Sequence, residues 1–549
     1  MHPRVPHPTP PPPPWREYDL DHGVIHTDVQ PATARTLTAA FVLLIFSVPV
    51  GQMIWELAHY QSPVVLQVFQ TVPTRSSLRQ YEEDLENAAL PRQYFQPLLQ
   101  LGVSSALGFG SDKVAMGRDG WLFYTPGLDY LTGPGFLDAE QLHHRHKKMV
   151  EEGKTDFHPD PRPAILQFHE QCRQRGARLV LLPIPDKAQI QPAQVSRHVE
   201  FRDPIPAPNN PDYQRFVAEL RQHGVEVLDI LPSQLAPDDR RFLTQDTHWT
   251  PQWMDRVARQ VAERLQPQLP AATAPALAKQ SEPIARLGDL VDMLRLPPGQ
   301  TLFQPQSVTV ERIVDARSKL PWQASAAAEA LLLGDSFCNI FSSDQMGWGD
   351  SAGFAEHLAY YLGRPLDRLV RNDAGAHATR EMLAKELRRG NDRLAGKKVV
   401  IWEFAARELA CGDWKLFPLV LGERKTVEFY LPEANRTVEV RGIVRAVSAA
   451  PRPGSVPYKD HILTIHLADI ESADDTSATD KEAVVFAWSM RDNKAMPAAR
   501  YRPGDTVRLH LQPWSDVASK YEAIKRSELD DENLLYADPA WTGDVGQEK

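Results

Sequence analysis

A stretch of twenty residues without a formal charge, Thr36 to Trp55, restricts the fold of this chain more than any other segment. Twenty residues of α-helix cross the ~30 Å hydrocarbon core of a bilayer, and a helix satisfies every backbone polar group within lipid. A helix buried in a protein core is the alternative, but the stretch has no polar face of the kind that surface helices carry. We therefore expect one transmembrane helix over residues 36–58.

The distribution of arginine predicts how this helix is oriented. Three arginines precede the stretch, whereas only Arg75 lies in the twenty residues after Ala58. This asymmetry keeps the amino end in the cytoplasm and exports the rest of the chain to the periplasm. The segment before the stretch is long for a leader and no A-x-A site follows, so we expect an uncleaved signal anchor in the inner (cytoplasmic) membrane. Residues 1–35, with the run Pro10 to Pro14, are expected to form a disordered proline-rich cytoplasmic tail.

Short apolar strands alternate with amphipathic helices between residues 59 and 415. Such alternation predicts an α/β domain with a mainly parallel sheet flanked by helices. Residues 267–325, rich in Ala, Pro and Gln, interrupt the pattern and are interpreted as an insertion with a helix at Leu287 to Leu294. The predicted strands are Arg178–Ile184, Val225–Leu228, Ala330–Leu333 and Val399–Phe404, and the predicted helices are Ala164–Arg173, Tyr213–His223 and one that follows Trp249.

The pattern changes after residue 420 to alternating strands separated by turns. The expected strands are Thr437–Val447, His461–Leu467, Ala483–Ser489 and Thr506–Leu511. They predict a small all-β domain over residues 420–535, for which an OB-like barrel is our first choice. Trp488, Trp514 and Tyr458 offer faces that stack on sugar rings, but core packing explains them equally well, so glycan binding by this domain stays open. The acidic last twenty residues are expected to fray.

The stretch Leu331 to Phe341, LLLGDSFCNIF, contains the first sign of chemistry. Its leucines predict a buried strand, and Gly334-Asp335-Ser336 predicts a sharp turn into a helix. A serine on such a turn presents its hydroxyl at the carboxyl edge of the sheet, beside free N–H groups of the helix. Asp335 is interpreted as a turn residue.

Ser336 needs a base, and His248 is the histidine with the most suggestive neighbour. Asp246 lies two positions before it, and in an extended segment residues i and i+2 share a face. The carboxylate would accept the Nδ1–H of the imidazole and leave Nε2 to face the serine, as in an Asp-His-Ser triad. The alternative is a capping aspartate beside a surface histidine at the start of a helix.

Composition excludes some classes of function. The net charge of -10 leaves no basic surplus to neutralise phosphates, so we expect no nucleic-acid partner. The three cysteines, Cys172, Cys338 and Cys411, lie far apart without metal-ligand spacing, and we favour three buried apolar side chains over one disulfide and a free thiol. Without a nucleotide-binding fingerprint or a metal motif, we expect no cofactor and no metal.

Four motifs give the chain a resemblance to a known family. They are GRDGWLFY (Gly117 to Tyr124), PDKAQIQP (Pro185 to Pro192), DTHW (Asp246 to Trp249) and LLLGDSF (Leu331 to Phe337). Together they resemble the AlgX/AlgJ-like polysaccharide O-acetyltransferases, whose catalytic domain is a variant of the SGNH hydrolase fold. The Asp-x-His precedes the serine, whereas ordinary SGNH esterases place the serine first. The resemblance covers roughly residues 60–410.

The resemblance implies roles for individual residues. Ser336 would be the nucleophile, His248 the general base and acid, and Asp246 its orienting partner. Because SGNH enzymes add a glycine and an asparagine to the oxyanion hole, Asn372 or Gly375 could supply donors, although a plain left-handed turn fits the same stretch. Glu403 is expected to be structural.

The resemblance also implies an activity with partners. We expect a periplasmic enzyme that transfers acetyl groups to hydroxyls of an exported polysaccharide, with an MBOAT-type membrane acyltransferase as the acetyl donor. A carbohydrate acetylesterase with the same triad is one alternative, and a non-catalytic glycan-binding scaffold of an export complex is another. Whether the polysaccharide is alginate, cellulose or another exopolysaccharide stays open.

Overall fold

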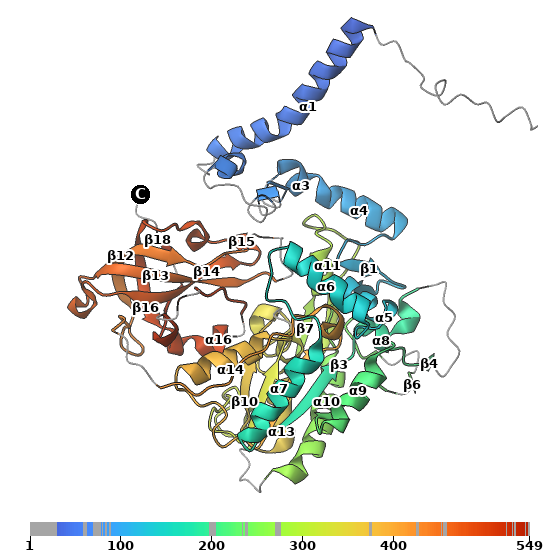
Figure 1. Cartoon of the computed structure of the whole chain (residues 1–549), viewed down its shortest axis with the longest axis vertical. Coiled ribbons are helices and arrows are strands. Elements are labelled where there is room, and N and C mark those ends of the chain that lie inside the picture. Colours follow the sequence, from blue (N-terminus) through green and yellow to red (C-terminus); the bar gives the residue numbers. More distant parts are fainter. Residues whose placement is uncertain are drawn as a thin grey trace, which may run out of the picture. The chain divides into compact units, whose positions relative to one another are not determined.

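The computed structural model describes residues 30–58, 63–69, 89–196, 205–232, 234–235, 240–269, 276–372, 376–423, 428–451, 458–522, 524–529, 534–543 and 545–546, with a few isolated positions between these ranges. The chain divides into two compact units, residues 1–90 and residues 91–549. Among the described residues, every strand belongs to the second unit (Figure 1).

The first unit contains the helix expected from the uncharged stretch. Helix α1, Pro31–Ala58, has a mean hydropathy of 2.1 over its most apolar part, and only 6% of that part is buried. By its length and composition it could cross a membrane. It begins at Pro31, five residues earlier than predicted, because proline is favoured in the first turn of a helix. The rest of the predicted tail, residues 1–29, lies outside the described residues.

The predicted parallel sheet is confirmed in the second unit. Five strands lie in the order β10-β9-β11-β3-β5, and each neighbouring pair is parallel. The strands predicted from the sequence return with nearly the same bounds, and β10 is added at one edge. Their bounds are β3 Arg178–Ile184, β5 Glu226–Val227, β9 Ala330–Gly334, β10 Asp367–Val370 and β11 Val399–Ala405.

Helices cover both faces of this sheet, as continuous apolar strands require. Alternate residues of β9 show the division, because Leu332 belongs to one core cluster while Leu331 and Leu333 belong to the other. Helices α10 (Pro251–Leu265) and α13 (Phe354–Leu362) contribute to the first cluster. The second cluster contains residues of α7 (Pro161–Gln174), α9 (Tyr213–Gln222) and α14 (Ala378–Arg388).

The predicted insertion is more ordered than its composition indicates. Besides the expected short helix, α11 (Asp289–Met293), it forms a two-stranded antiparallel ribbon of β7 (Leu277–Arg286) and β8 (Gln306–Asp315). All side chains of β7 are exposed or half-buried, so this strand has no apolar alternation for a sequence pattern to detect.

The carboxyl-terminal strands close into a five-stranded barrel. Going round it, the order is β12-β13-β14-β17-β16, and β16 pairs with β12 again. β14 and β17 are parallel, while the other pairs are antiparallel. The bounds are β12 Val438–Val447, β13 His461–Glu471, β14 Ala483–Arg491, β16 Thr506–Pro513 and β17 Ala540–Thr542.

The expectation that the last twenty residues fray is wrong for β17. This strand lies beyond residue 535, and Ala540 and Trp541 are 0% and 2% exposed. It closes the gap between β14 and β16, so its apolar side chains are buried on both sides of the barrel wall.

Candidate active site

Ser336 lies where the sequence analysis expected it, on a sharp turn after β9. It is the first residue of a short helix, α12 (Ser336–Asn339), that begins directly after Asp335. The carboxylate of Asp335 caps this helix by accepting the N–H of Phe337 at 2.8 Å, and its other oxygen accepts the N–H of Ala405 at 3.1 Å. Asp335 therefore fixes the turn between β9, α12 and the end of β11.

The buried carboxyl of Glu403 stabilises the same turn through two hydrogen bonds. Oε2 of Glu403 accepts the N–H of Asp335 at 2.9 Å and the S–H of Cys338 at 3.0 Å. Burial, reinforced by the charge of Asp335, raises the pKa of Glu403 well above its ordinary value. A protonated carboxyl in this position has a structural role, because it holds the residues on either side of Ser336.

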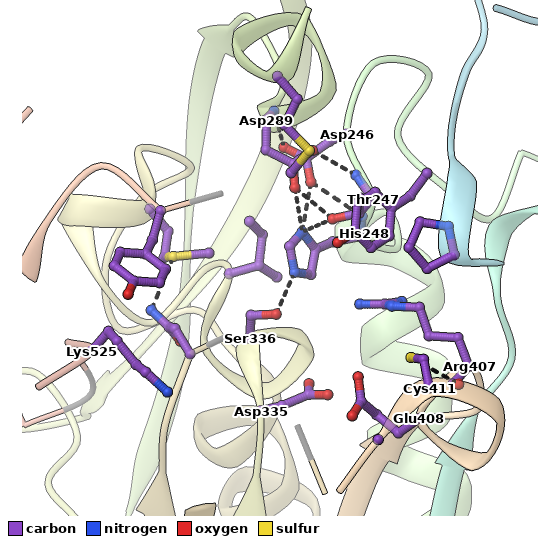
Figure 2. A pocket seen from close by; sticks show the side chains of 18 of the residues that line it. Asp246, Thr247, His248, Asp289, Asp335, Ser336, Arg407, Glu408, Cys411 and Lys525 are labelled. Atoms are coloured by element: carbon purple, nitrogen blue, oxygen red, sulfur yellow. Dashed lines mark hydrogen bonds and ion pairs between the residues drawn. The ribbon is translucent and has the colours of Figure 1, made fainter. Parts of the chain in front are cut away.

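His248 reaches Ser336 from the segment that precedes α10. Its Nε2 is 2.8 Å from Oγ of Ser336, and its Nδ1 is 2.6 Å from Oδ1 of Asp246 (Figure 2). The three side chains are all buried. Asp246 and Ser336 are 90 positions apart in the sequence. The structure brings these two residues and His248 together, with the histidine between the carboxylate and the hydroxyl as in an Asp-His-Ser triad.

Asp246 is held as an anion by several donors. Its Oδ2 accepts Nε1–H of Trp348 at 2.9 Å and the N–H of Asp289 at 3.1 Å. Burial alone would raise the pKa of Asp246, but the hydrogen bonds, above all the one with His248, outweigh it and lower the pKa to about 2. For His248, burial favours the neutral ring, but the bond and charge of Asp246 outweigh it and raise the pKa.

Asp289 is a further carboxyl in the site, and sequence reasoning missed its role. Its two oxygens accept the N–H of Thr247 at 2.8 Å and the hydroxyl of Thr247 at 2.5 Å, and Oδ2 lies 3.8 Å from Nδ1 of His248. Burial and then the charge of Asp246 raise the pKa of Asp289 to about 7. Its position at the start of the predicted insertion helix was visible in the sequence, but nothing there linked it to His248.

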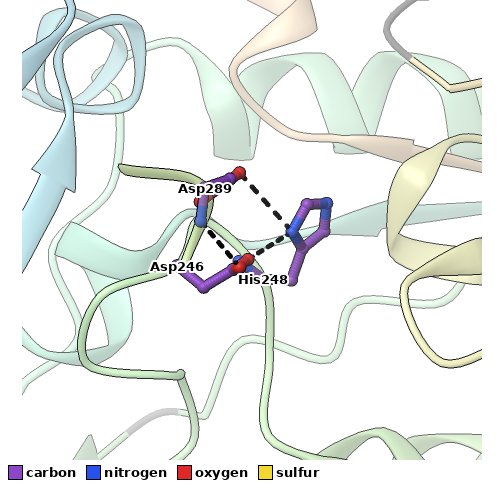
Figure 3. Close-up of side chains that lie close together, drawn as sticks. All are labelled: Asp246, His248 and Asp289. Carbon is purple, nitrogen blue, oxygen red and sulfur yellow. Dashed lines mark hydrogen bonds and ion pairs between the residues drawn. The ribbon is translucent and has the colours of Figure 1, made fainter. Parts of the chain in front are cut away.

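Asp246, His248 and Asp289 also form the one group in the described residues whose ligand atoms are close enough to hold a metal ion (Figure 3). The donors already present argue for a hydrogen-bond network instead. Nδ1 of His248 needs its proton to donate to Asp246, and the oxygens of both carboxylates already accept N–H or O–H groups.

The motif PDKAQIQP supports the site from β3. Its Lys187 donates from Nζ to the carbonyls of Thr244 and Asp246 at 2.8 and 3.0 Å. Burial lowers the pKa of this lysine to about 7. Its Asp186 accepts the guanidinium of Arg407 at 3.0 Å and the N–H of the same residue at 2.9 Å. The motif thus joins the histidine segment to the end of β11.

The two oxyanion candidates differ in what the structure describes. Asn372 follows β10, lines the same cavity as Ser336, and its Nδ2 lies against Sδ of Met346 at 3.2 Å, a weak acceptor. Gly375 lies outside the described residues. In the described part of the chain, the backbone N–H of Ser336 donates to no protein acceptor.

A cavity of about 720 Å³ opens over Ser336 and His248. On one side of Ser336 lie Arg407, Glu408 and Cys411, and on the other lies Lys525 (Figure 2). Burial, which the nearby Arg407 only partly offsets, raises the pKa of Glu408 to about 7. Barrel residues complete the wall, namely Tyr458, Lys459, Asp460, Ile524 and Lys525. The candidate site is therefore built from the α/β domain and the barrel together.

The structure changes one side-chain expectation, for the cysteines, and favours one of two open alternatives for Trp488. Cys172 and Cys338 are buried free thiols as expected, but Cys411 is exposed, because it lies on the wall of the cavity. Trp488 is only 3% exposed and packs edge-on against Trp541, so it belongs to the core of the barrel. Tyr458, in contrast, lines the cavity.

Comparison with known proteins places this site in context. The family model of the SGNH hydrolase-like domain of acetyltransferase AlgX matches residues 114–406, more than half of the chain. The probable alginate O-acetylase AlgJ of Pseudomonas aeruginosa is 26% identical over 257 residues, which are 44% of this chain and 58% of that protein. Its counterpart in Pseudomonas syringae pv. tomato is 26% identical over 327 residues, or 57% of this chain and 75% of that protein.

Two solved structures are also similar to this chain. The O-acetyltransferase domain of Pseudomonas putida AlgJ aligns over 54% of this chain and 92% of its own, with 21% identity and a TM-score of 0.38. Pseudomonas aeruginosa AlgX aligns over 70% of this chain and 87% of its own, with 17% identity and a TM-score of 0.36. The match to the first curated relative spans less than two thirds of that relative's length.

Proposed function

Because the chain belongs to the family of SGNH hydrolase-like AlgX acetyltransferase domains, we propose that it is a serine-dependent O-acetyltransferase acting on an exported polysaccharide. One observation carries the proposal: Nε2 of His248 lies 2.8 Å from Oγ of Ser336 while Nδ1 lies 2.6 Å from Asp246. A histidine held in this way can take a proton from the serine and return it later.

In the first half of the reaction, Ser336 takes the acetyl group from a donor ester. His248 accepts the Oγ proton as Oγ attacks the acetyl carbonyl, and Asp246 stabilises the imidazolium that forms. The N–H of Ser336 and Nδ2 of Asn372 are the groups we assign to the developing oxyanion. Collapse of the tetrahedral intermediate breaks the bond to the donor oxygen, which receives the proton from His248, and leaves acetyl-Ser336.

In the second half, a sugar hydroxyl replaces the donor. His248 takes the hydroxyl proton, the sugar oxygen attacks the acetyl-serine, and the serine leaves with the proton returned. Water in place of the sugar would make the same site an esterase, so the balance depends on how well the cavity excludes water. The wall that the barrel adds to the cavity favours transfer, since it gives an extended acceptor more surface than the α/β domain alone.

The domain arrangement that we propose has four parts. A cytoplasmic tail (1–35) precedes a signal anchor (36–58), an O-acetyltransferase domain (59–415) and a barrel that begins near residue 420. The apolar helix α1 supports anchoring in the inner membrane with the enzyme in the periplasm. An MBOAT-type membrane acyltransferase would then supply the acetyl group. The curated relatives are called probable alginate O-acetylases, and we propose alginate or another exopolysaccharide as acceptor.

We also propose that the barrel is an OB-like domain. Its strand order, with the third and fifth strands parallel, supports this assignment. OB barrels bind oligosaccharides and oligonucleotides on the face of their second and third strands. With a net charge of -10, the oligosaccharide is the class of ligand that suits this chain.

The proposal is tested with a chromogenic acetyl ester and the detergent-solubilised chain. We expect ester turnover by the wild type and none above background by Ser336→Ala. When polysaccharide fragments are added, a sugar hydroxyl should replace water as the acceptor of the acetyl group. Mass spectrometry of the fragments detects the acetylated sugar. Equal turnover by wild type and Ser336→Ala would exclude the serine mechanism, whereas acetate release without acetylated sugar would favour the esterase.

A further inference from the structure

A second cavity, of about 690 Å³, lies between α14 of the α/β domain and the barrel. His377 and Lys525 line both this cavity and the one above Ser336, so the two cavities adjoin. On the barrel side its wall includes Thr464 of β13 with Val484 and Phe486 of β14. These are the second and third strands of the barrel.

The second cavity is basic although the chain as a whole is acidic. Among the described residues that line it, six are lysine or arginine and three are aspartate or glutamate, whereas the chain carries a net charge of -10. The basic residues are Arg371, Lys385, Arg388, Arg389, Lys525 and Arg526. A surplus of positive charge in a concave site attracts anions.

Arg371 is the most unusual of these residues. It is 6% exposed, and in the described structure neither Nε nor one of its terminal nitrogens has a hydrogen-bond partner. Burial, and then repulsion by Arg526, lower its pKa to about 10. A guanidinium is nearly always paired when it is buried, because an unpaired buried charge is costly. The guanidinium of Arg371 therefore has hydrogen-bond donors left for an acceptor from a bound ligand.

Arg526 faces the same cavity and is also incompletely paired. Its guanidinium lies 4.4 Å from the ring centroid of Phe486 and 5.3 Å from that of Trp514, so cation–π contacts help to hold it in place. NH1 has no partner among the described residues, and Nε is a long 3.4 Å from Glu528. Glu528 makes its short ion pair, of 2.6 Å, with Lys385 instead.

These observations lead to one site. We propose that Arg371 and Arg526 together bind an oxyanion, the carboxylate of an acidic sugar in the acceptor polysaccharide. Guanidinium groups bind carboxylates through parallel charge-assisted hydrogen bonds, and the free nitrogens of the two arginines provide such donors. The carboxylate also removes the repulsion between the two cations.

The position of the site identifies the sugar chain as the source of the carboxylate. The two barrel loops that flank the predicted binding face supply Tyr458, Lys459 and Lys525 to the cavity of Ser336. A chain lying on the β13–β14 face and across these loops would carry a neighbouring hydroxyl into that cavity. This inference rests on the proposed function, since it assumes that the acceptor is a polysaccharide.

Binding is measured with the full chain in detergent, in the Ser336→Ala background so that no turnover occurs. An oligouronate, a neutral cello-oligosaccharide and inorganic phosphate are titrated by calorimetry. We expect the oligouronate to bind and Arg371→Met or Arg526→Met to weaken it about tenfold or more, the loss typical of one charge-assisted pair. Arg526→Lys keeps the positive charge but loses the bidentate geometry of the guanidinium, so its affinity for the oligouronate should lie between those of the parent and Arg526→Met.

Arg445→Met is the matched control, because Arg445 lies on β12 of the same barrel, pairs with Glu482, and lines neither cavity. It should bind oligouronate like the parent. Thermal unfolding checks that the variants fold, and Arg371→Met should be no less stable than the parent, because it removes unpaired buried N–H groups.

Two results would overturn the inference. One is an oligouronate affinity that is the same in the folded Arg371→Met and Arg526→Met variants as in the parent. The other is binding of phosphate that depends on these arginines, with no binding of oligouronate. In either case, wild-type turnover of the acetyl ester would leave the proposed function standing, whereas absent turnover would count against that function separately.

Discussion

Replacing Asp246 by asparagine separates the charge of the carboxylate from its shape. Asparagine keeps the shape of the side chain, one oxygen of which lies 2.6 Å from Nδ1 of His248 in the wild type. It removes the negative charge that stabilises the imidazolium, and when its NH2 group faces Nδ1 it also favours the tautomer with the proton on Nε2. That tautomer cannot accept the proton of Ser336. We expect a large loss of kcat with little change in shape.

The size of the loss follows from the pKa of Asp246. It lies at about 2, below its ordinary value of 3.8, so the surroundings of this carboxylate as a whole, burial included, favour the charged form by roughly 2 kcal/mol. Loss of a stabilisation of that size from the imidazolium corresponds to a decrease in rate on the order of 30-fold. If the amide also imposes the wrong tautomer, the loss approaches the ~10⁴-fold seen when a serine-protease triad loses its aspartate charge.

The same pKa predicts how stability depends on pH. A carboxyl whose pKa is lowered by folding contributes stability that is fully present above its unfolded pKa, near 3.8, and is lost as the pH falls towards 2. Asp246→Asn should therefore unfold more easily at neutral pH and lose this part of its acid sensitivity.

The assay is kcat/KM for a chromogenic acetyl ester as a function of pH. Asp255→Asn is the control, because Asp255 lies 2.6 Å from Nδ1 of His357 in a pair of the same geometry that lines neither cavity. It should affect stability but not turnover. Wild-type kcat/KM in folded Asp246→Asn would refute the role that we assign to this carboxylate.

Three further changes probe the surroundings of the triad. Asp289→Asn should move the acid limb of the kcat/KM profile to lower pH, because above about pH 7 the ionised carboxylate favours the imidazolium of His248; an unmoved limb contradicts the coupling. Glu403→Gln should keep turnover and melting temperature near wild type, because the raised pKa leaves this carboxyl neutral, and a folded but inactive variant would show that its charge matters. Gly334→Ala should destabilise the chain by about 1–3 kcal/mol, measured by denaturant unfolding, because its methyl group would overlap Sγ of Cys338; unchanged stability would show that the turn can relax.

The parallel sheet could be predicted from the sequence because its strands are short and wholly apolar. Arg178–Ile184 was predicted with the bounds that β3 has, since six of its seven residues are buried. The ribbon of β7 and β8 could not, because no side chain of β7 is buried and Pro283 lies within that strand. β17 is three residues long in an acidic segment, and only closure of the barrel makes it a strand.

The candidate site was predictable only where chemistry is local or carried by a motif. Asp246 and His248 are two positions apart, and the turn at Ser336 follows an apolar strand. Trp348 contacts Asp246 across 102 positions and Asp289 does so across 43, and no periodicity encodes such contacts. Arg371 and Arg526 likewise meet only because the barrel packs beside α14.

The central claim is that Ser336 carries the acetyl group. The chain is incubated with an acetyl ester, quenched in acid and digested, and the peptides are analysed by mass spectrometry. We expect one acetyl group on the peptide that contains Ser336, located on that residue by fragmentation, and none on this peptide in Ser336→Ala. Acetylation of a different residue together with full turnover by Ser336→Ala would contradict the account.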